Sequence, residues 1–230
     1  EGRTTIYEPS PSRDHTERML SFMGIELNKE NGISLEGGEN LSPLKIRVPG
    51  DFSSAAFFIA LALLTRSHLF LENVGLNPTR TGMLNVLRDM GAKLEIRDLR
   101  EEGNEPLGDI EVEGGEIEGT LIDRDIPLMI DEIPILAIIG ARAKGITEIS
   151  NAEELRHKET DRIKALAVGL RKMGVEVEER RDGLLIKGGE TKGAVVNSFG
   201  DHRIAMAFTI LGLASEGETV IRGAQCIDIS

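Results

Sequence analysis

Three segments of the chain align with one another without gaps, and this internal repeat constrains the fold more than any other feature. The segments are SSAAFFIALALLTRS from Ser53, DEIPILAIIGARAKG from Asp131 and RIAMAFTILGLASEG from Arg203. Each is apolar on most faces of a helix, so we expect three buried helices. A short β-rich run follows each of them: HLFLENV, ITEISNA and ETVIRGA.

A second, amphipathic helix pattern also recurs, and each copy stops at a glycine suited to a helix C-cap. RDHTERMLSFMG ends at Gly24, RTGMLNVLRDMG at Gly91 and ETDRIKALAVGLRKMG at Gly174. Alternating strand patterns follow (IELN, AKLEI, VEVEE), and two copies add a further strand, GISLEGG and GLLIKGG. The repeating unit is therefore βαβαββ, which predicts an α/β (α+β) fold built around buried helices.

Ser53, Asp131 and Arg203 occupy the same place in the three repeats, the start of the buried helix. If the units pack with pseudo-symmetry, these helix N-termini converge. Helix N-termini present free N–H groups and a partial positive charge, so several together form a site for phosphate or carboxylate. A structural alternative for Asp131 is that of an acidic first-turn residue that favours the helix dipole.

Structural alternatives exist for the other two positions as well. Asp51, Ser53 or Ser54 could serve simply as an N-cap. Arg203 opposes the dipole of its helix, so an anion must offset its charge. Asp201, two residues earlier, would do so as a structural ion pair, and a bound anion would do so as a ligand.

The stretch RHKETDR, residues 156–162, places charges of both signs at the start of an outer helix. Thr160 is a candidate N-cap, and Glu159 and Asp161 suit the first turn. A solvated run of surface charges is the ordinary alternative for such a stretch.

Lys158 and Arg162 are four residues apart, and on one helix face they would bring two cations to a helix N-terminus. Together with Arg203 they could bind phosphate or carboxylate. Asp131 and Glu159 are then candidates for proton transfer, because carboxylates held near cations and a substrate hydroxyl can act as general bases. The pattern indicates transfer chemistry on an anionic small molecule.

Composition limits the alternatives. The net charge of -12 and the absence of Trp argue against a nucleic-acid partner. The longest apolar run, Ala55 to Leu64, is too short to span a bilayer, and the single cysteine, Cys226, fits a reducing cytoplasm. The four histidines lack HxxxH spacing, so we expect no metal site. His157 and His202 lie beside the cationic positions and are further site candidates.

Four motifs resemble the 5-enolpyruvylshikimate-3-phosphate synthase (EPSP synthase) family: LRHKETDR at 155–162, FGDHRIAMA at 199–207, SRDHTERML at 12–20 and IDEIPILA at 130–137. The resemblance implies two domains, each of three βαβαββ units in an inside-out α/β barrel. It implies transfer of the enolpyruvyl group of phosphoenolpyruvate to the 5-hydroxyl of shikimate 3-phosphate, with release of phosphate. This step of the shikimate pathway leads to chorismate and the aromatic amino acids, requires no cofactor or metal, and is the target of glyphosate.

The resemblance also implies roles for individual residues. Asp131 matches an aspartate at the shikimate hydroxyls that is proposed as the base, and Glu159 matches a proposed proton-transfer glutamate. Lys158 matches a lysine at the 3-phosphate and the 5-hydroxyl of shikimate 3-phosphate. The remaining substrate-binding matches are Arg162 and Arg203 at phosphoenolpyruvate, Asp201 and His202 in the same DHR motif, and Ser12 and Arg13, with Ser10, in a shikimate-phosphate segment.

Several motifs of the family are missing from this chain, among them an N-terminal Lys-Ser motif, a Gly-rich loop and a C-terminal phosphoenolpyruvate lysine. We therefore expect a fragment, in which residues 1–47 form the C-terminal part of the first domain and 48–230 form most of the second. The boundary would lie near Lys45 to Gly50. Such a fragment should be inactive alone and prone to self-association through exposed strand edges, whereas the full-length enzyme is expected to be monomeric and cytoplasmic.

Two other hypotheses remain. One is an enolpyruvyl transferase of the same fold that acts on a nucleotide sugar. The other is a non-catalytic repeat scaffold whose charged helix starts are only caps and salt bridges.

Overall fold

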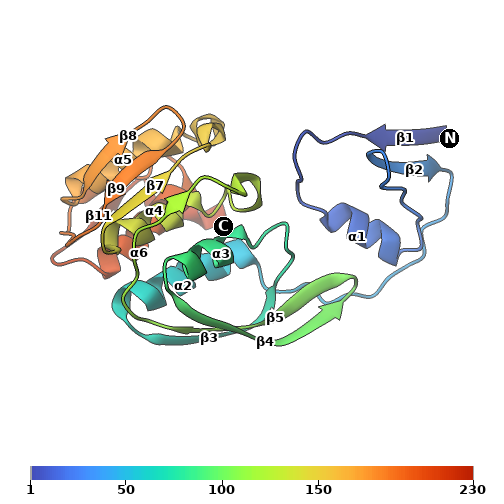
Figure 1. Cartoon of the computed structure of the whole chain (residues 1–230), viewed down its shortest axis with the longest axis horizontal. Coiled ribbons are helices and arrows are strands. Elements are labelled where there is room, and N and C mark those ends of the chain that lie inside the picture. The colour runs from blue at the N-terminus through green and yellow to red at the C-terminus, as the bar shows by residue number, and fades with distance from the viewer. Residues whose placement is uncertain (1, 230) are drawn as a thin grey trace.

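The computed structural model describes residues 2–229, and its N-terminal segment lies to one side of the larger body (Figure 1). This segment contains β1 (Gly2–Ile6), α1 (His15–Phe22) and β2 (Ile33–Gly37). The two strands pair antiparallel, with Gly2 opposite Gly37 and Ile6 opposite Ile33. No residue of α1 is buried.

The first unit of the larger body is a helix-covered antiparallel sheet with the strand order β3-β5-β4. The runs HLFLENV and AKLEI form β3 and β4. The repeat predicts a strand before the buried helix, and at this place Gly50 makes a parallel bridge to Val74. The elements are α2 (Phe52–Thr65), β3 (His68–Gly75), α3 (Gly82–Asp89), β4 (Lys93–Glu102) and β5 (Glu105–Glu113).

The second unit has the complete βαβαββ order, with its strands arranged β6-β7-β9-β8. Strand β6 runs parallel to β7, and β9 is antiparallel to both β7 and β8. The elements are β6 (Leu121–Ile122), η1 (Ile126–Leu128), α4 (Ile133–Arg142), β7 (Ile146–Ile149), η2 (Glu153–His157), α5 (Arg162–Lys172), β8 (Glu176–Glu179) and β9 (Leu184–Lys187).

The third unit is represented by its first half. Strands β10 (Val195–Asn197) and β11 (Val220–Arg222) are parallel, and α6 (His202–Leu213) connects them. A 3-10 helix, η3 (Ala224–Ile229), follows. The predicted repeat is thus confirmed, because in each unit a buried helix connects two segments that pair in parallel.

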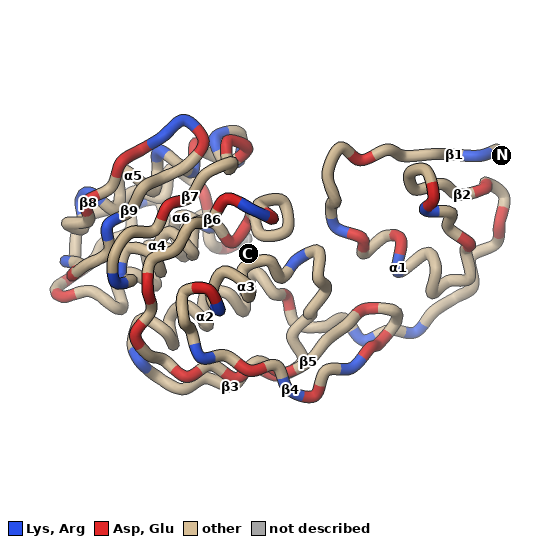
Figure 2. The backbone as a smooth tube through the Cα atoms, in the orientation of Figure 1, with Lys and Arg blue, Asp and Glu red and all other residues tan. Residues whose placement is uncertain are grey.

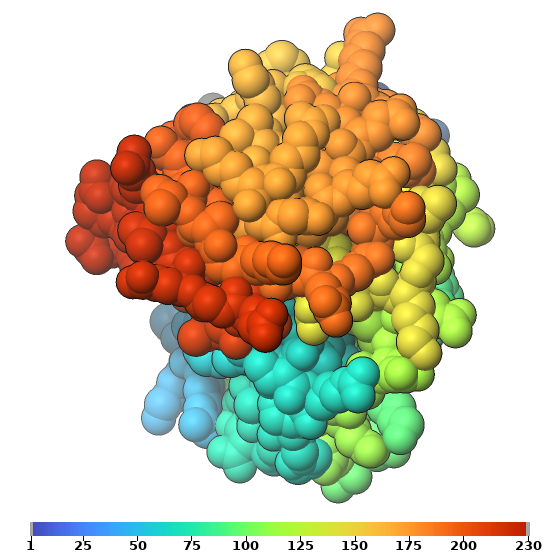
Figure 3. Space-filling model, turned by 90° about the vertical axis from the view of Figure 1, so that its left-hand side faces the viewer, coloured from blue at the N-terminus to red at the C-terminus, as the bar shows by residue number. Residues whose placement is uncertain are grey.

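The three buried helices α2, α4 and α6 pack against one another in the core of the larger body. Every residue of α4 except Arg142 is buried. The outer helix α5 approaches α6 so closely that a Cβ on Gly169 would lie 2.1 Å from Cζ of Phe208. The second and third units, yellow to red, stack directly on the first unit, cyan to green (Figure 3).

Three details concern the sequence predictions. Gly24, Gly91 and Gly174 all adopt positive φ, as C-cap glycines do. The predicted strand IELN is wrong, because only Asn28 of it makes a bridge, to Ser34. Strand β5 was not predicted.

The hydrophobic cluster of the larger body consists of residues between 52 and 211. The division at residue 47 stays a prediction. Over residues 2–229, none of the helices has the length and apolar character that crossing a bilayer requires.

Candidate active site

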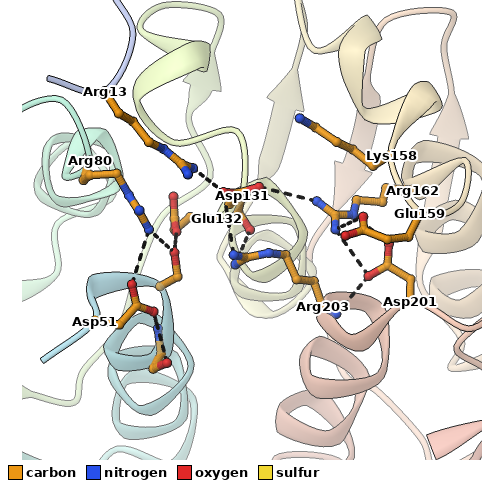
Figure 4. A network of polar contacts seen from close by, with 12 residues as sticks. Arg13, Asp51, Arg80, Asp131, Glu132, Lys158, Glu159, Arg162, Asp201 and Arg203 are labelled. Atoms are coloured by element: carbon orange, nitrogen blue, oxygen red, sulfur yellow. Dashed lines mark hydrogen bonds and ion pairs between the residues drawn. The ribbon is translucent and has the colours of Figure 1, made fainter. Parts of the chain in front are cut away.

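The N-termini of the three buried helices converge, as the repeat predicts. Ser53 at the start of α2 donates a hydrogen bond from Oγ to the carboxyl group of Glu132, the N-cap of α4. Arg203 at the start of α6 donates from Nη1 to the backbone oxygen of Asp131 at 3.2 Å. Asp131 and Glu132 therefore link the start of α4 to both neighbouring helices (Figure 4).

Asp131 is the centre of a cluster of three arginines, which we call the arginine cluster: Arg13, Arg162 and Arg203. Arg13 hydrogen-bonds Oδ2, Arg203 Nη2 lies 3.6 Å from the same oxygen, and Arg162 Nη1 lies 3.7 Å from Oδ1. Burial raises the pKa of the Asp131 carboxyl, but the three guanidinium charges outweigh it and hold this pKa below its usual value. Asp131 is thus an ionised carboxylate among cations.

Arg162 is buried, with only 1% of its side chain exposed. Its Nε donates to Asp201 Oδ2 at 2.8 Å, and Nη2 donates to Glu159 Oε2 at 2.6 Å. Its Nη1 atom is buried and has no hydrogen-bond partner. A buried guanidinium N–H without an acceptor is costly, so this Nη1, which lies 3.7 Å from Asp131 Oδ1, is a donor that a bound anion would satisfy.

Asp201 is fully buried and is the N-cap of α6, accepting hydrogen bonds from the backbone N–H groups of Arg203 and Ile204. Its carboxylate pairs with Arg162. The alternative of a structural ion pair between the side chains of Asp201 and Arg203 is therefore not what the structure contains. A carboxylate held by the helix start and by Arg162 cannot turn to Arg203, whose charge is offset by Asp131 instead.

The KETDR stretch differs from the prediction in its helix start. Asp161, and not Thr160, is the N-cap of α5, because its carboxylate accepts from the backbone N–H of Lys164 at 2.9 Å. Lys158 lies before the helix, at the end of η2, and does not share a helix face with Arg162. Its ammonium pairs with Glu154.

The remaining candidates lie at different places. Arg13 comes from the N-terminal segment and reaches Asp131 across 118 positions of sequence. Ser12 is exposed and donates to Glu8, so it does not contact the cluster, and Ser10 is exposed as well. His202 opens α6, and its Nδ1 atom is buried without a hydrogen-bond partner.

Sequence reasoning missed a second polar chain beside the cluster, formed by Arg80, Ser53 and Glu132. Arg80, in the turn after β3, donates from Nη2 to Ser53 Oγ at 2.6 Å and lies 3.4 Å from Asp51, the N-cap of α2. Glu132 is only 1% exposed, and burial raises the pKa of its carboxyl despite the Ser53 hydrogen bond and the charges of Arg203 and Arg80. The sequence signal that could have identified Glu132 as a site residue is its position directly after Asp131.

The site combines the groups that acid–base transfer chemistry on an anion requires. Cations converge with one ionised carboxylate at helix N-termini, and a half-exposed carboxylate, Glu159, lies on Arg162. Across residues 2–229, no group of His, Cys, Asp and Glu has a metal-binding arrangement. Acidic and basic positions are interspersed along the chain (Figure 2), so the cationic character of the site is local.

Comparison with known proteins agrees with this combination of fold and site. A sequence model of the family described as EPSP synthase (3-phosphoshikimate 1-carboxyvinyltransferase) matches residues 1–230. The 3-phosphoshikimate 1-carboxyvinyltransferase of Desulforamulus reducens is 49% identical over 234 residues, and that of Bacillus subtilis is 47% identical over 235 residues. Both alignments cover all of this chain, but only 54% and 55% of the relatives. The EPSP synthase structure from Acinetobacter baumannii superposes with a TM-score of 0.94 at 43% identity, covering 99% of this chain and 54% of that one.

The repeated βαβαββ units with a charged site at their converging helix starts define the class of fold and site to which this chain belongs. More specifically, the chain belongs to the EPSP synthase family. It spans about half the length of the curated relatives it matches.

Proposed function

We propose that a protein of the relatives' full length that carries this sequence transfers the enolpyruvyl group of phosphoenolpyruvate to the 5-hydroxyl of shikimate 3-phosphate, releasing phosphate. The observation that carries the proposal is the arginine cluster around Asp131, in a chain whose family and relatives bear the name of this reaction. The reaction has two anionic substrates and two proton transfers, which match the cations and carboxylates of the site.

We assign each cation to a substrate according to the hydrogen-bond donors that it has available. Arg162 has a buried, unpartnered Nη1, and Arg203 is held against Asp131 by contacts of 3.2 Å and 3.6 Å that a stronger acceptor can replace. These two arginines would bind phosphoenolpyruvate, because bidentate guanidinium contacts suit carboxylate and phosphate. Arg13 and Lys158 would bind shikimate 3-phosphate, and His202 would lie beside the bound phosphoenolpyruvate.

The carboxylates would transfer the protons. Asp131, ionised among its arginines, would accept the proton of the 5-hydroxyl as that oxygen attacks C2 of phosphoenolpyruvate. Glu159, about half exposed beside Arg162, would serve at C3, which gains a proton in the addition and loses one when phosphate leaves. The arginines would stabilise the negative charge that remains on the departing phosphate.

Asp201 would act by positioning, since it is fully buried and holds both Arg162 and the first turn of α6. Ser12 would reach shikimate 3-phosphate only if its loop left Glu8. We further propose that residues 1–47 belong to the first domain of the full-length enzyme and 48–230 to the second. The full-length enzyme would be a monomer in the cytoplasm, and the chain alone would self-associate.

The test is release of inorganic phosphate from phosphoenolpyruvate by the full-length protein with different acceptors. We expect turnover with shikimate 3-phosphate and none with UDP-N-acetylglucosamine. The opposite preference would assign the site to a nucleotide-sugar transferase, and no turnover with either would favour the scaffold hypothesis. The 230-residue chain alone should show almost no turnover, because about half of the relatives' length is missing from it.

A further inference from the structure

We propose that Glu132 takes up a proton when an anion binds to Arg203 and thereby adjusts the charge of the site to that of its ligand. The inference deepens the proposed function, because it rests on Arg203 being an anion-binding residue. Glu132 is buried from solvent, and the hydrogen bond to its side chain comes from Ser53 and not from the arginine cluster.

The first step of the argument is the position of Glu132. The side chain is buried where the starts of α2 and α4 meet, and its carboxyl group accepts a hydrogen bond from Ser53 Oγ. Ser53 is 4% exposed and in turn accepts from Arg80 Nη2. Arg80 also has a buried Nε without a hydrogen-bond partner. The carboxyl is thus buried and held in place, and the hydrogen-bonded route from Arg80 to it passes through one hydroxyl.

The second step is the set of charges that face this carboxyl. Arg203 on α6 and Arg80 after β3 favour its ionised form, whereas Asp131 on the same segment opposes it. Burial outweighs the two arginines, so the pKa of Glu132 is already raised. The neighbouring carboxyl of Asp131 differs because three arginines surround it, and its pKa is lowered.

The third step is what an anion does to this balance. The charge of Arg203 acts on both carboxyls: it favours the ionised form of Glu132, and its guanidinium lies 3.6 Å from Asp131. An anion on Arg203 cancels the positive charge that Glu132 experiences and adds negative charge nearby. Asp131 retains Arg13 and Arg162, while Glu132 retains only Arg80 behind Ser53. Glu132 is therefore the group that becomes protonated, and the proton comes from solvent.

The experiment follows the Glu132 carboxyl carbon directly by NMR, in the 230-residue chain labelled with [5-13C]glutamate. Sulfate is the probe, because it stays a dianion over the whole range and contributes no protons of its own. The Glu132 resonance is identified by through-bond correlation and by its loss in Glu132→Gln, which keeps the acceptor for Ser53. We expect sulfate to move its titration midpoint upward by about one pH unit relative to chloride at equal ionic strength.

Two comparisons make the result specific. In Arg203→Gln the sulfate-dependent movement of the Glu132 midpoint should disappear. In the native chain, the midpoint of Glu113, which is 64% exposed at the end of β5, should not respond to sulfate. A Glu132 midpoint that sulfate leaves unchanged or lowers would overturn the inference. If the backbone amide signals of Arg203 and Ile204 still respond to sulfate in that case, the anion site and the proposed function stand. If they do not respond, the anion site at Arg203 of this chain fails together with the inference, and the proposed function is decided separately by the phosphate-release assay of the full-length protein.

Discussion

The ion pair of Arg162 and Asp201 provides the most quantitative prediction, because the chain contains an exposed counterpart. Asp201→Ser removes the carboxylate but keeps a residue that caps a helix as well as aspartate does. The substitution leaves a guanidinium that is 1% exposed without its main partner, at a site where the carboxylate was fully buried. Breaking a buried pair from one side costs about 3–5 kcal/mol, so we expect a loss of that order in the free energy of unfolding.

Asp161→Ser is the matched control. Asp161 is also a helix N-cap, and it also pairs with an arginine, Arg156, at 2.7 Å. Its side chain is 33% exposed and that of Arg156 is 21% exposed, so solvent screens the charges and can hydrate the arginine left behind. We expect a loss of less than about 1 kcal/mol for this variant.

Urea unfolding of the two variants and the native chain measures both losses on one scale. A third variant, Asp201→Ser combined with Arg162→Met, removes the unpaired charge and should recover part of the stability lost in Asp201→Ser alone. Equal losses for Asp201→Ser and Asp161→Ser would refute the reasoning. So would a double variant that is less stable than Asp201→Ser, because the cost would then lie in the contacts of Arg162 and not in its unpaired charge.

Further predictions concern packing, pH and binding. Gly169→Ala should lower the free energy of unfolding by about 1–3 kcal/mol, measured by urea unfolding, because the new methyl group meets the ring of Phe208 at 2.1 Å. The pKa of Asp131 is lowered in the folded chain, so its ionised carboxylate stabilises the fold at pH values above the usual carboxyl pKa. This stabilisation is lost as the pH falls through the folded-state pKa. The difference in free energy of unfolding between the native chain and Asp131→Asn, measured by urea unfolding, should therefore shrink below about pH 4. Lys158→Ala should raise the Kd for shikimate 3-phosphate, measured by isothermal titration calorimetry, about tenfold. Lys187→Ala, which removes a lysine from an exposed ion pair with Glu176, should leave this Kd unchanged.

The fold was predictable from the sequence where the signal is local and repeated. The apolar fifteen-residue segments, and the glycines at 24, 91 and 174, fix the buried helices and the ends of the outer ones. Strand β5 escaped prediction because Pro106 and Gly108 near its start are residues typical of turns. The IELN run failed for the opposite reason. Its alternating pattern suits a strand, but of its four residues only Asn28 pairs with another segment.

The site was predictable as a set of residues but not as a set of pairs. Repetition brings the three helix starts together, and this places Asp131 beside Arg203. The choice of partner depends on distances that the sequence does not contain. Asp201 pairs with Arg162 across 39 positions, and Arg80 reaches Ser53 across 27. The N-cap at Asp161 in place of Thr160 is a shift of one residue, within the ordinary uncertainty of helix boundaries.

The central claim is that Asp131, held ionised by the arginine cluster, is the base of an enolpyruvyl transfer. The most direct test is the steady-state rate of phosphate release from phosphoenolpyruvate and shikimate 3-phosphate by the full-length protein carrying Asp131→Asn. We predict that kcat falls by a factor of about 10² or more, since loss of a general base removes a contribution of about 10²–10⁴, while KM for phosphoenolpyruvate changes far less. A folded variant whose kcat stays within about threefold of the native value would contradict this assignment.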